Sequence, residues 1–316
     1  MDLQTRMKSG LLAGIIGDAL GVPREYSTAL EHSLCAVKNE LGYGRFDHPE
    51  GTWSDDASLS LCTMESLCNG YNIDEMGKLF CRWMFEGYWT PGGYVFDSGL
   101  TTFLALDDLR AGRKSVRSCG QALDDDNGNG SLMRMLPAAL YFRNKPVDGF
   151  LAAIHEISQI THAHPRSKMA CGMYALLVRE LISGADKGRA YTSAINQARD
   201  YYEREEAFRK EFGAFSRILS YRLPEYEEGE IKSSGYVIDT LESAVWTFMK
   251  FGSTREILLK TVNMGLDTDT TGMTAGGLAG LCHGLDDVPL QWIEVLARRT
   301  DIEQLVDRFV TQAMQQ

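Results

Sequence analysis

The residues best suited to chemistry are concentrated in residues 265–280, where two aspartates and three threonines precede a glycine-rich helical segment. Side chains two positions apart diverge on a helix but share one side of an extended chain. We therefore expect Asp267 and Asp269 to lie on an extended chain, with Thr270 or Thr271 as the N-cap of the helix. Oxygens that converge at the positive end of a helix suit a hard cation, although Asp and Thr are equally common in an ordinary capped turn.

A second stretch, residues 51–59, repeats this combination at the start of an apolar helix. Ser54 supplies a hydroxyl beside the carboxylates of Asp55 and Asp56. Together the two stretches offer four carboxylates, whose charge balances two divalent cations. Two cations about 3.5–4 Å apart form a known hydrolytic arrangement. Oxygen ligands without His or Cys favour Mg²⁺ or Mn²⁺ over Zn²⁺, so the pair predicts a dinuclear hydrolytic site.

Composition restricts the class of protein. The chain has 316 residues, 44% hydrophobic and 24% charged, which is typical of a soluble globular protein. A net charge of −11 and scattered Lys and Arg residues argue against a nucleic-acid partner, but cations can still admit a small anionic ligand. No apolar run reaches about 18 residues, so we expect no membrane span. Seven dispersed cysteines and the lack of a signal-peptide layout predict reduced thiols and a cytoplasmic location.

Helical periodicity dominates the chain, and no series of alternating strand residues interrupts it. We expect a single all-α domain over residues 1–316, without internal repeats or linkers. The clearest helices are expected at residues 3–21, 54–68, 73–86, 147–160, 166–183, 254–263, 289–297 and 302–314. Residues 27–53 are expected to be irregular, and the charged residues 185–232 to form solvated helices and connections.

The first of these helices carries two unusual features. Its small residues Gly10, Gly14, Gly17 and Gly21 recur on one side, which would let another backbone come close. Asp18 interrupts the apolar run of residues 11–20, and a buried carboxylate needs a partner. Glu25 follows in a loop, where an isolated glutamate is ordinarily a solvated surface charge.

Three further places could contribute to a site. Asp97 precedes a helix and could be its N-cap or a site residue. Residues 124–137 form a polar, glycine-bearing loop that could present backbone N–H groups to an anion, with Arg134 adding a positive charge, or could be a solvated turn. His162 has no nearby Cys or acid to complete a zinc set, so we expect it to line a ligand cleft.

Several of these stretches, in this order, resemble the ADP-ribosylglycohydrolase family, which includes the dinitrogenase reductase-activating glycohydrolases. The matching stretches are residues 11–26, 51–59, 96–102, 128–137, 161–162, 235–246 and 265–280. The resemblance implies one compact, orthogonal all-α domain with a dinuclear metal site in a cleft. It also implies hydrolysis that releases ADP-ribose from modified side chains or related conjugates.

Carried over residue by residue, the resemblance implies metal ligands at Ser54, Asp55, Asp56, Asp267, Asp269 and Thr270. It implies a substrate site made by Asn127, Gly128, Asn129, Gly130, Ser131, His162 and Tyr236, with the loop on the diphosphate and the tyrosine near the nucleoside. It implies catalytic roles for Glu25, Asp97, Asp56 and Asp269. The usual Thr-Asp-Asp-Thr motif is Ser54-Asp55-Asp56-Ala57 here, so a hydrogen bond that supports one metal is lost at Ala57.

The resulting hypothesis is a metal-dependent hydrolase, with two Mg²⁺ or Mn²⁺ ions, that cleaves ADP-ribose from a modified protein side chain. The favoured substrate is ADP-ribosyl-arginine. Its partner would be an ADP-ribosylated protein or an ADP-ribose conjugate. The alternatives are an ADP-ribose-binding or toxin-neutralising (immunity) protein that occludes an ADP-ribosyltransferase, or a hydrolase or phosphoesterase that acts on a free ADP-ribose conjugate. The intact carboxylate set argues against a dead site, because buried unpaired acids are costly to keep.

Overall fold

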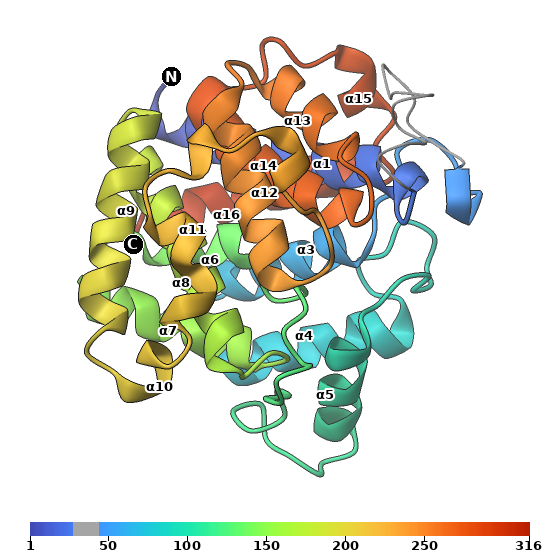
Figure 1. Ribbon diagram of the computed structural model, residues 1–316. Coiled ribbons are helices and arrows are strands. Elements are labelled where there is room, and N and C mark those ends of the chain that lie inside the picture. The colour runs from blue at the N-terminus through green and yellow to red at the C-terminus, as the bar shows by residue number, and fades with distance from the viewer. Residues whose placement is uncertain (28–43) are drawn as a thin grey trace.

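The computed structural model describes residues 1–27 and 44–316, and these residues are predominantly helical, with no β-strand among them (Figure 1). The predicted all-α class is confirmed. Of residues 27–53, expected to be irregular, residues 28–43 lie outside the described residues. No helix in the described ranges is long and apolar enough to cross a membrane.

Two helices from opposite ends of the chain lie side by side in the middle of the molecule (Figure 1): α1 (Leu3–Gly21) and α14 (Thr268–His283). They touch backbone to backbone. A Cβ atom on Gly17 would lie 2.1 Å from the carbonyl oxygen of Gly272, and one on Gly280 would lie 2.2 Å from that of Ser9. The close approach predicted from the small residues of the first helix is therefore present, and its partner is the glycine-rich helix.

The remaining helices surround this pair. On one side lie α3 (Asp55–Cys68), α4 (Ile73–Glu86), α5 (Leu100–Arg110) and α16 (Arg299–Ala313). On another lie α6 (Met135–Phe142), α7 (Val147–Gln159), α8 (Pro165–Ile182) and α9 (Lys187–Tyr202). The pair α12 (Val237–Lys250) and α13 (Thr254–Val262) packs against α14. Short turns of helix connect these elements: η1 (Val22–Arg24), η2 (Gly44–Phe46), α10 (Glu206–Arg209), η3 (Phe212–Phe215), α11 (Ser216–Leu219), η4 (Leu223–Glu225), η5 (Glu228–Glu230) and α15 (Leu290–Glu294).

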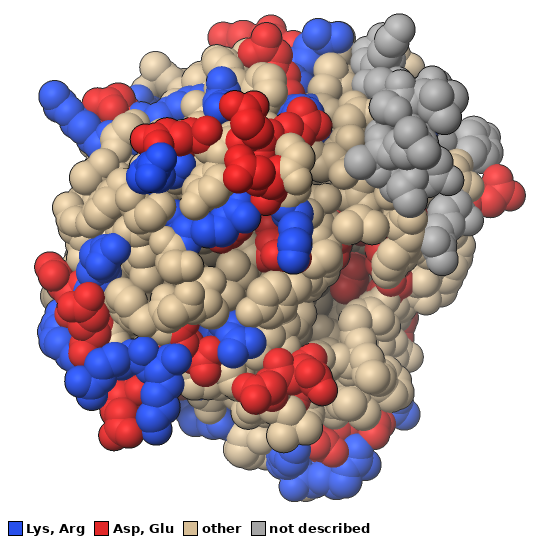
Figure 2. All heavy atoms as spheres, viewed as in Figure 1, with Lys and Arg blue, Asp and Glu red and all other residues tan. Residues whose placement is uncertain are grey.

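Local sequence explains both ends of α4. The Asn72 side chain accepts hydrogen bonds from the backbone N–H groups of Asp74 and Glu75 at 3.0 and 3.3 Å, which starts α4. The helix ends at Gly87, whose φ of 70° lies in the left-handed region that glycine adopts readily. The charged residues 185–232 form helices and connections as predicted, and acidic and basic side chains are intermixed on the surface over α9 and α10 (Figure 2).

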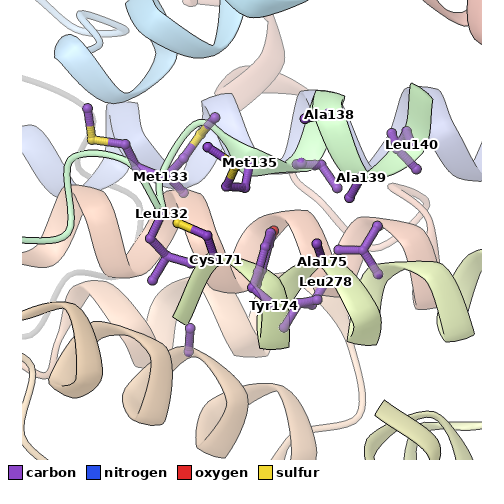
Figure 3. Close-up of a cluster of buried hydrophobic side chains, with 14 of the residues drawn as sticks. Leu132, Met133, Met135, Ala138, Ala139, Leu140, Cys171, Tyr174, Ala175 and Leu278 are labelled. Carbon is purple, nitrogen blue, oxygen red and sulfur yellow. The ribbon is translucent and has the colours of Figure 1, made fainter. Parts of the chain in front are cut away.

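The core between α6, α8 and α14 is filled by interlocking small and large apolar side chains. Figure 3 shows side chains of α6 and of the turn before it facing those of α8, among them Leu132, Met135, Ala139, Cys171, Tyr174 and Ala175. Tyr174 is 1% exposed, and its hydroxyl donates to the carbonyl oxygen of Thr274 on α14 at 3.2 Å. This packing holds α14 against the rest of the molecule, and with it the residues at the start of α14.

The predicted start of the C-terminal glycine-rich helix is wrong by three or four residues. α14 begins at Thr268 with Asp267 in the N-cap position, so Asp269 stands in the first helical turn instead of on an extended chain. The reason is tertiary: the Thr268 hydroxyl donates to the carbonyl oxygen of Gly21 at 2.8 Å and attaches this end of α14 to the end of α1. Neither Thr270 nor Thr271 is therefore the N-cap.

The helix expected at residues 289–297 is also shorter than predicted. α15 ends at Glu294, and the Ala297 N–H donates to the carbonyl oxygen of Gly51 at 3.0 Å. That long-range bond connects Ala297 to the stretch that precedes α3, so residues 295–297 do not continue the helix.

Candidate active site

The N-terminal ends of α3 and α14 open onto a cavity of about 260 Å³. It is visible in Figure 2 as a hollow with acidic side chains inside it. Among the described residues that line it, the carboxylates are Glu25, Asp55, Asp56, Asp97, Asp125, Asp267 and Asp269. No lysine or arginine belongs to this described lining. The N-termini of α3 and α14, and that of α5 at Gly99–Leu100, direct backbone N–H groups and their positive potential toward the cavity.

Asp18 determines how α3 begins. Its side chain is fully buried, and its carboxylate accepts hydrogen bonds from the N–H groups of Ser54 at 3.0 Å and Ala57 at 2.9 Å. These are the partners that the sequence required for a buried carboxylate. Burial raises the pKa of Asp18 to about 7, while the hydrogen bonds from Ser54 and Ala57 oppose that rise. Asp18 thus caps a helix that belongs to a distant part of the chain, and orients its first turn.

The first turn of α3 joins the two acidic stretches. The Ser54 hydroxyl accepts from the Asp56 N–H at 3.3 Å and donates to Asp56 Oδ2 at 3.0 Å. From α14, the Thr270 hydroxyl donates to the same Asp56 oxygen at 3.4 Å. Asp55, Asp56, Asp267, Asp269 and Thr270 all line the cavity, whereas Ser54 lies behind them. The structure therefore brings the two stretches together, as their shared composition suggested.

Glu25 is buried, with 4% of its surface exposed, although an isolated loop glutamate would ordinarily be solvated. The backbone explains the difference. Tyr26 has a φ of 60° and Leu266 a φ of 61°, both in the left-handed region. The Tyr26 N–H donates to the Leu266 carbonyl at 2.6 Å, and the Leu266 N–H donates to the Ser27 carbonyl at 2.8 Å. This pairing reverses the chain and turns Glu25 inward, next to Asp267.

Asp97 lies in the cavity and is not a helix cap. α5 begins at Leu100 with Gly99 as its N-cap residue. One oxygen from each of Glu25, Asp97 and Asp269 lies within 4.8 Å of the other two. Three carboxylates at this separation repel one another unless they hold protons or share a cation.

The electrostatics of the cavity favour a bound cation. Burial, followed by the charge of Asp97, raises the pKa of Glu25 to about 9. Burial raises the pKa values of Asp55, Asp56 and Asp269 well above their usual range, and neighbouring carboxylates add to each rise. Within the described residues, Glu25 Oε2, Asp56 Oδ1 and Asp267 Oδ1 are buried without a hydrogen-bond partner. Buried carboxylate oxygens that accept no hydrogen bond and lie close to other negative charges are the ligands that a hard divalent cation requires.

The loop predicted to bind a diphosphate lies along the same cavity. Its backbone pairs with the start of α12: the Asn129 N–H donates to the Gly235 carbonyl at 3.1 Å, and the Val237 N–H donates to the Asn127 carbonyl at 3.0 Å. The Asn129 side chain donates to Asp267 Oδ2 at 3.0 Å, which connects the loop to the acids. Gly128, Asn129 and Gly130 line the cavity.

Other predicted substrate residues lie behind this lining. The Asn127 side-chain oxygen accepts from the Ser167 hydroxyl at 3.0 Å, and the Ser131 hydroxyl accepts from Ser158 at 3.0 Å. Neither side chain faces the cavity. Tyr236 is the N-cap residue of α12 and is also outside the lining, although its neighbour Gly235 belongs to it.

Arg134 does not line the cavity. It is fully buried, donates to the carbonyl oxygen of Gly130 at 2.6 Å and to the Thr161 hydroxyl at 2.8 Å, and lies over the ring of Phe80. The predicted positive charge of Arg134 therefore lies beneath the loop and not in the cavity lining, because these internal acceptors hold the guanidinium there. Burial lowers its pKa to about 10, which still leaves it charged at neutral pH.

His162 lines the cavity, as expected, and is neutral. Burial and then the charge of Arg134 lower its pKa to about 3. Its Nδ1 atom is 2.8 Å from the Thr161 hydroxyl oxygen. His164, by contrast, caps α8 by accepting from the Arg166 N–H at 3.1 Å.

Some lining residues were not identified from the sequence. Thr102 of α5 is 1% exposed and lines the cavity beside Gly130, where a Cβ atom would lie 3.0 Å from the Thr102 hydroxyl oxygen. Asp125 and Tyr26 also belong to the lining. Their only sequence signal was their position next to Asn127 and Glu25, because nothing in their own spacing indicates a site.

Comparisons with known proteins agree with this geometry. The family model described as ADP-ribosylglycohydrolase matches residues 1–316. The chain is 28% identical to an ADP-ribosylarginine hydrolase Tri1 of Serratia proteamaculans, over 96% of this chain and 78% of that protein. It is 27% identical to an ADP-ribosyl-[dinitrogen reductase] glycohydrolase of Rhodospirillum rubrum, over 94% and 92% of the two chains.

A solved structure titled "ADP-ribosylglycohydrolase-related protein complex" is 27% identical and covers 99% of both chains with a TM-score of 0.78. The fold and the sequence therefore lead to one family. This chain belongs to the ADP-ribosylglycohydrolase family, and it is a hydrolase.

Proposed function

We propose that this enzyme removes ADP-ribose from a modified protein side chain, with ADP-ribosylarginine as its preferred substrate, and that it uses two divalent cations, Mg²⁺ or Mn²⁺. The names of two relatives support the reaction. One is an ADP-ribosylarginine hydrolase, and the other is a glycohydrolase of ADP-ribosyl-dinitrogen reductase. Both align with more than nine-tenths of this chain, so the similarity that supports the proposal extends over nearly the whole chain.

The observation that carries the proposed cation dependence is the charge of the cavity. Its described lining contains seven carboxylates and no lysine or arginine. A diphosphate carries negative charge and would be repelled by such a surface. The proposed cation ligands are Ser54, Asp55, Asp56, Asp267, Asp269 and Thr270. When bound, the cations offset the carboxylate charge, polarise substrate oxygens and make a water molecule more acidic.

Glu25 and Asp97 are the proposed proton-handling groups. The reaction breaks the bond between the anomeric carbon of the distal ribose and the side-chain nitrogen, and adds water across it. Glu25 accepts the proton of the attacking water, since a carboxylate beside cations stays ionised. Asp97 is half-buried and near Glu25, so it passes the proton toward the leaving nitrogen. The remaining carboxylates stabilise the positive charge that develops on the ribose.

The loop of residues 127–131 is the proposed diphosphate site. The N–H groups of Gly128 and Gly130 donate no hydrogen bond within the described part of the chain, and the absence of side chains lets an anion approach their backbone. Arg134 donates to the Thr161 hydroxyl, which can in turn donate its hydrogen to His162 Nδ1. The neutral ring then carries its proton on Nε2, near Gly128, as a donor to the substrate.

The experiment that tests the proposal is release of free ADP-ribose from arginine-, serine- and nucleobase-linked substrates, with Mg²⁺ or Mn²⁺ and then with EDTA. We expect release from the arginine-linked substrate, abolished by EDTA and restored by excess cation. Release that EDTA leaves unchanged would contradict the proposed cations. Tight binding of ADP-ribose by calorimetry, without release from any substrate, would instead indicate a binding protein.

A further inference from the structure

From Leu100 to Leu106, helix α5 carries apolar side chains on two faces, and only one of these faces is buried; Asp107, which pairs with Arg113, ends the outer face. Thr102, Ala105 and Leu106 face the interior. On the opposite side, Leu100 is 71% exposed, Phe103 41% and Leu104 42%. Spacings of three and four residues place these three side chains on a single helix face. A helix at the surface ordinarily carries polar residues there, so this outer face is unusual.

This exposed face begins at the cavity. Leu100, Thr101 and Thr102 line the cavity, and the outer face continues along α5 from that point. A fourth exposed side chain, Leu123, is 73% exposed and lies in the loop that contributes Asp125 to the cavity lining. In Figure 2, uncharged surface covers α5 next to the acidic hollow. We call Leu100, Phe103, Leu104 and Leu123 the apolar rim.

Of the other exposed large apolar side chains among the described residues, Tyr26, Tyr94 and Leu266 lie close in sequence to Glu25, Asp97 and Asp267, and the rest are scattered. Met1 and Met314 are at the chain ends, Tyr221 is in the charged segment, and Leu290 is on α15. Single exposed apolar residues need no explanation, whereas a group of them beside a binding cavity indicates a binding surface.

The cavity explains what would lie on this surface. Its volume of about 260 Å³ is too small to enclose a polypeptide segment. When the bond to be cleaved lies at the acids, the polypeptide that carries the modification remains outside, at the mouth. Its residues on either side of the modified arginine then lie against whatever surrounds the mouth, and the apolar rim is continuous with that mouth.

We infer that the apolar rim is the docking surface for the modified polypeptide, and that it selects substrates with large apolar side chains close to the ADP-ribosylated arginine. This inference rests on the proposed function and adds the substrate class to it. Burial of one large apolar side chain at the rim corresponds to about a tenfold gain in kcat/KM.

The test uses two synthetic peptides that each carry one ADP-ribosylarginine, together with free ADP-ribosylarginine. One peptide has Leu and Phe three positions before and after the arginine, and the other has Ser at both places. We expect the wild type to cleave the apolar peptide with about tenfold higher kcat/KM. Leu104→Glu should remove this preference, because Leu104 belongs to the rim but does not line the cavity. Free ADP-ribosylarginine should be cleaved equally by both proteins.

Leu290→Glu is the matched control, since Leu290 is also an exposed helical leucine, 63% exposed, but lies outside the rim. It should keep the peptide preference. Leu123→Glu provides a second rim variant in a loop, should Leu104→Glu unfold. Equal cleavage of the two peptides by the wild type, or a preference that survives in both rim variants, overturns the inference while the proposed function stands.

Two other outcomes have separate meanings. If no variant and no cation releases ADP-ribose even from free ADP-ribosylarginine, the proposed function fails and the inference fails with it. If the wild type dimerises in sedimentation experiments and Leu104→Glu abolishes the dimer, the rim is covered by a second copy of the chain, which also overturns the docking of a substrate there.

Discussion

Two regions of this protein are rich in acidic residues, and they differ in what surrounds each acid. Between residues 203 and 230 most acids are exposed, and several are paired with cations: Arg222 lies 2.7 Å from Glu225, and Lys210 lies 3.0 Å from Glu206. In the cavity the acids are mostly buried, and no lysine or arginine of the described lining accompanies them. Exposed ion pairs contribute about 0–1 kcal/mol each. Buried acids without partners reduce stability, so their retention indicates a function.

The largest expected difference between the two regions appears when one carboxylate charge is removed from each. Asp269→Asn should lower kcat by about 10³-fold or more, because it removes a proposed cation ligand without changing the side-chain volume. Glu225→Gln, in the paired region, should stay within about twofold of the wild type. The measurement is ADP-ribose release at saturating Mg²⁺. Similar rates for Asp269→Asn and the wild type would show that the two regions do not differ as proposed.

The cavity acids also depend on the backbone contact between α1 and α14. Gly17→Ala would place a Cβ atom 2.1 Å from the Gly272 carbonyl oxygen, so the helices must separate. We expect a loss of at least about 2–3 kcal/mol in the free energy of unfolding. The control is Gly149→Ala on α7, where nothing lies within 4 Å of the added atom. It should gain about 0.4–1 kcal/mol, because it restricts the unfolded chain.

Chemical denaturation of both glycine variants measures this difference. Equal stability of the two would mean that the backbone contact is not needed to hold the acids in place.

Cations should stabilise the cavity and leave the paired region unaffected. At a free Mg²⁺ or Mn²⁺ concentration of 100 times Kd, the free energy of unfolding should rise by about 2.7 kcal/mol. EDTA should reverse the gain. Asp269→Asn should lose the gain, and Glu225→Gln should keep it. In EDTA, Asp269→Asn should melt at or above the wild-type temperature, because a buried charge has been removed. A wild-type melting temperature that neither Mg²⁺ nor Mn²⁺ changes would contradict the proposed site.

Asp18 tests whether the proposed cation ligands need support from a residue that does not line the cavity. Asp18→Asn replaces an acceptor of two N–H bonds with an amide that has one oxygen, so the first turn of α3 is held less firmly. We expect the Mg²⁺ concentration for half-maximal activity to rise about tenfold or more, with activity recovered at high Mg²⁺. Asp74→Asn is the control, because Asp74 is exposed in the first turn of α4.

A loss of activity in Asp18→Asn that high Mg²⁺ cannot recover would assign Asp18 a structural role instead.

The smallest expected effect concerns His155, a buried ionisable group away from the cavity. Burial lowers its pKa to about 3 from an ordinary value of 6.5, and its Nε2 is 2.9 Å from the Tyr202 hydroxyl oxygen. Between these pH values the unfolded chain binds more protons, so the stability contribution is present above pH 6.5 and is lost as the pH falls. From pH 6.5 to 5 the wild type should lose about 2 kcal/mol more than His155→Gln.

Urea unfolding at each pH measures that difference. The opposite contribution of Glu242, whose pKa burial raises to about 7, is present in both proteins and cancels. Parallel pH profiles for the wild type and His155→Gln would show that His155 is not buried in its neutral form.

The sequence by itself was sufficient for the helical class, for most helix positions and for the meeting of the two acidic stretches. Residues 3–21 and 73–86 form the predicted helices: Asp2 and Asn72 cap their starts, and residues 73–86 also show a clear apolar periodicity. The family assignment also came from sequence, since it depends on ordered motifs and not on coordinates.

Only the tertiary structure decided which acids face the cavity and which polar groups are already engaged. Glu25 is buried because left-handed backbone at Tyr26 pairs with Leu266, some 240 positions away. Arg134 is directed inward because its acceptors come from two other segments. Asp18 accepts hydrogen bonds from two N–H groups at the start of α3. Hydrogen bonds and burial between distant segments are created by folding, so no local pattern of residues could have predicted them.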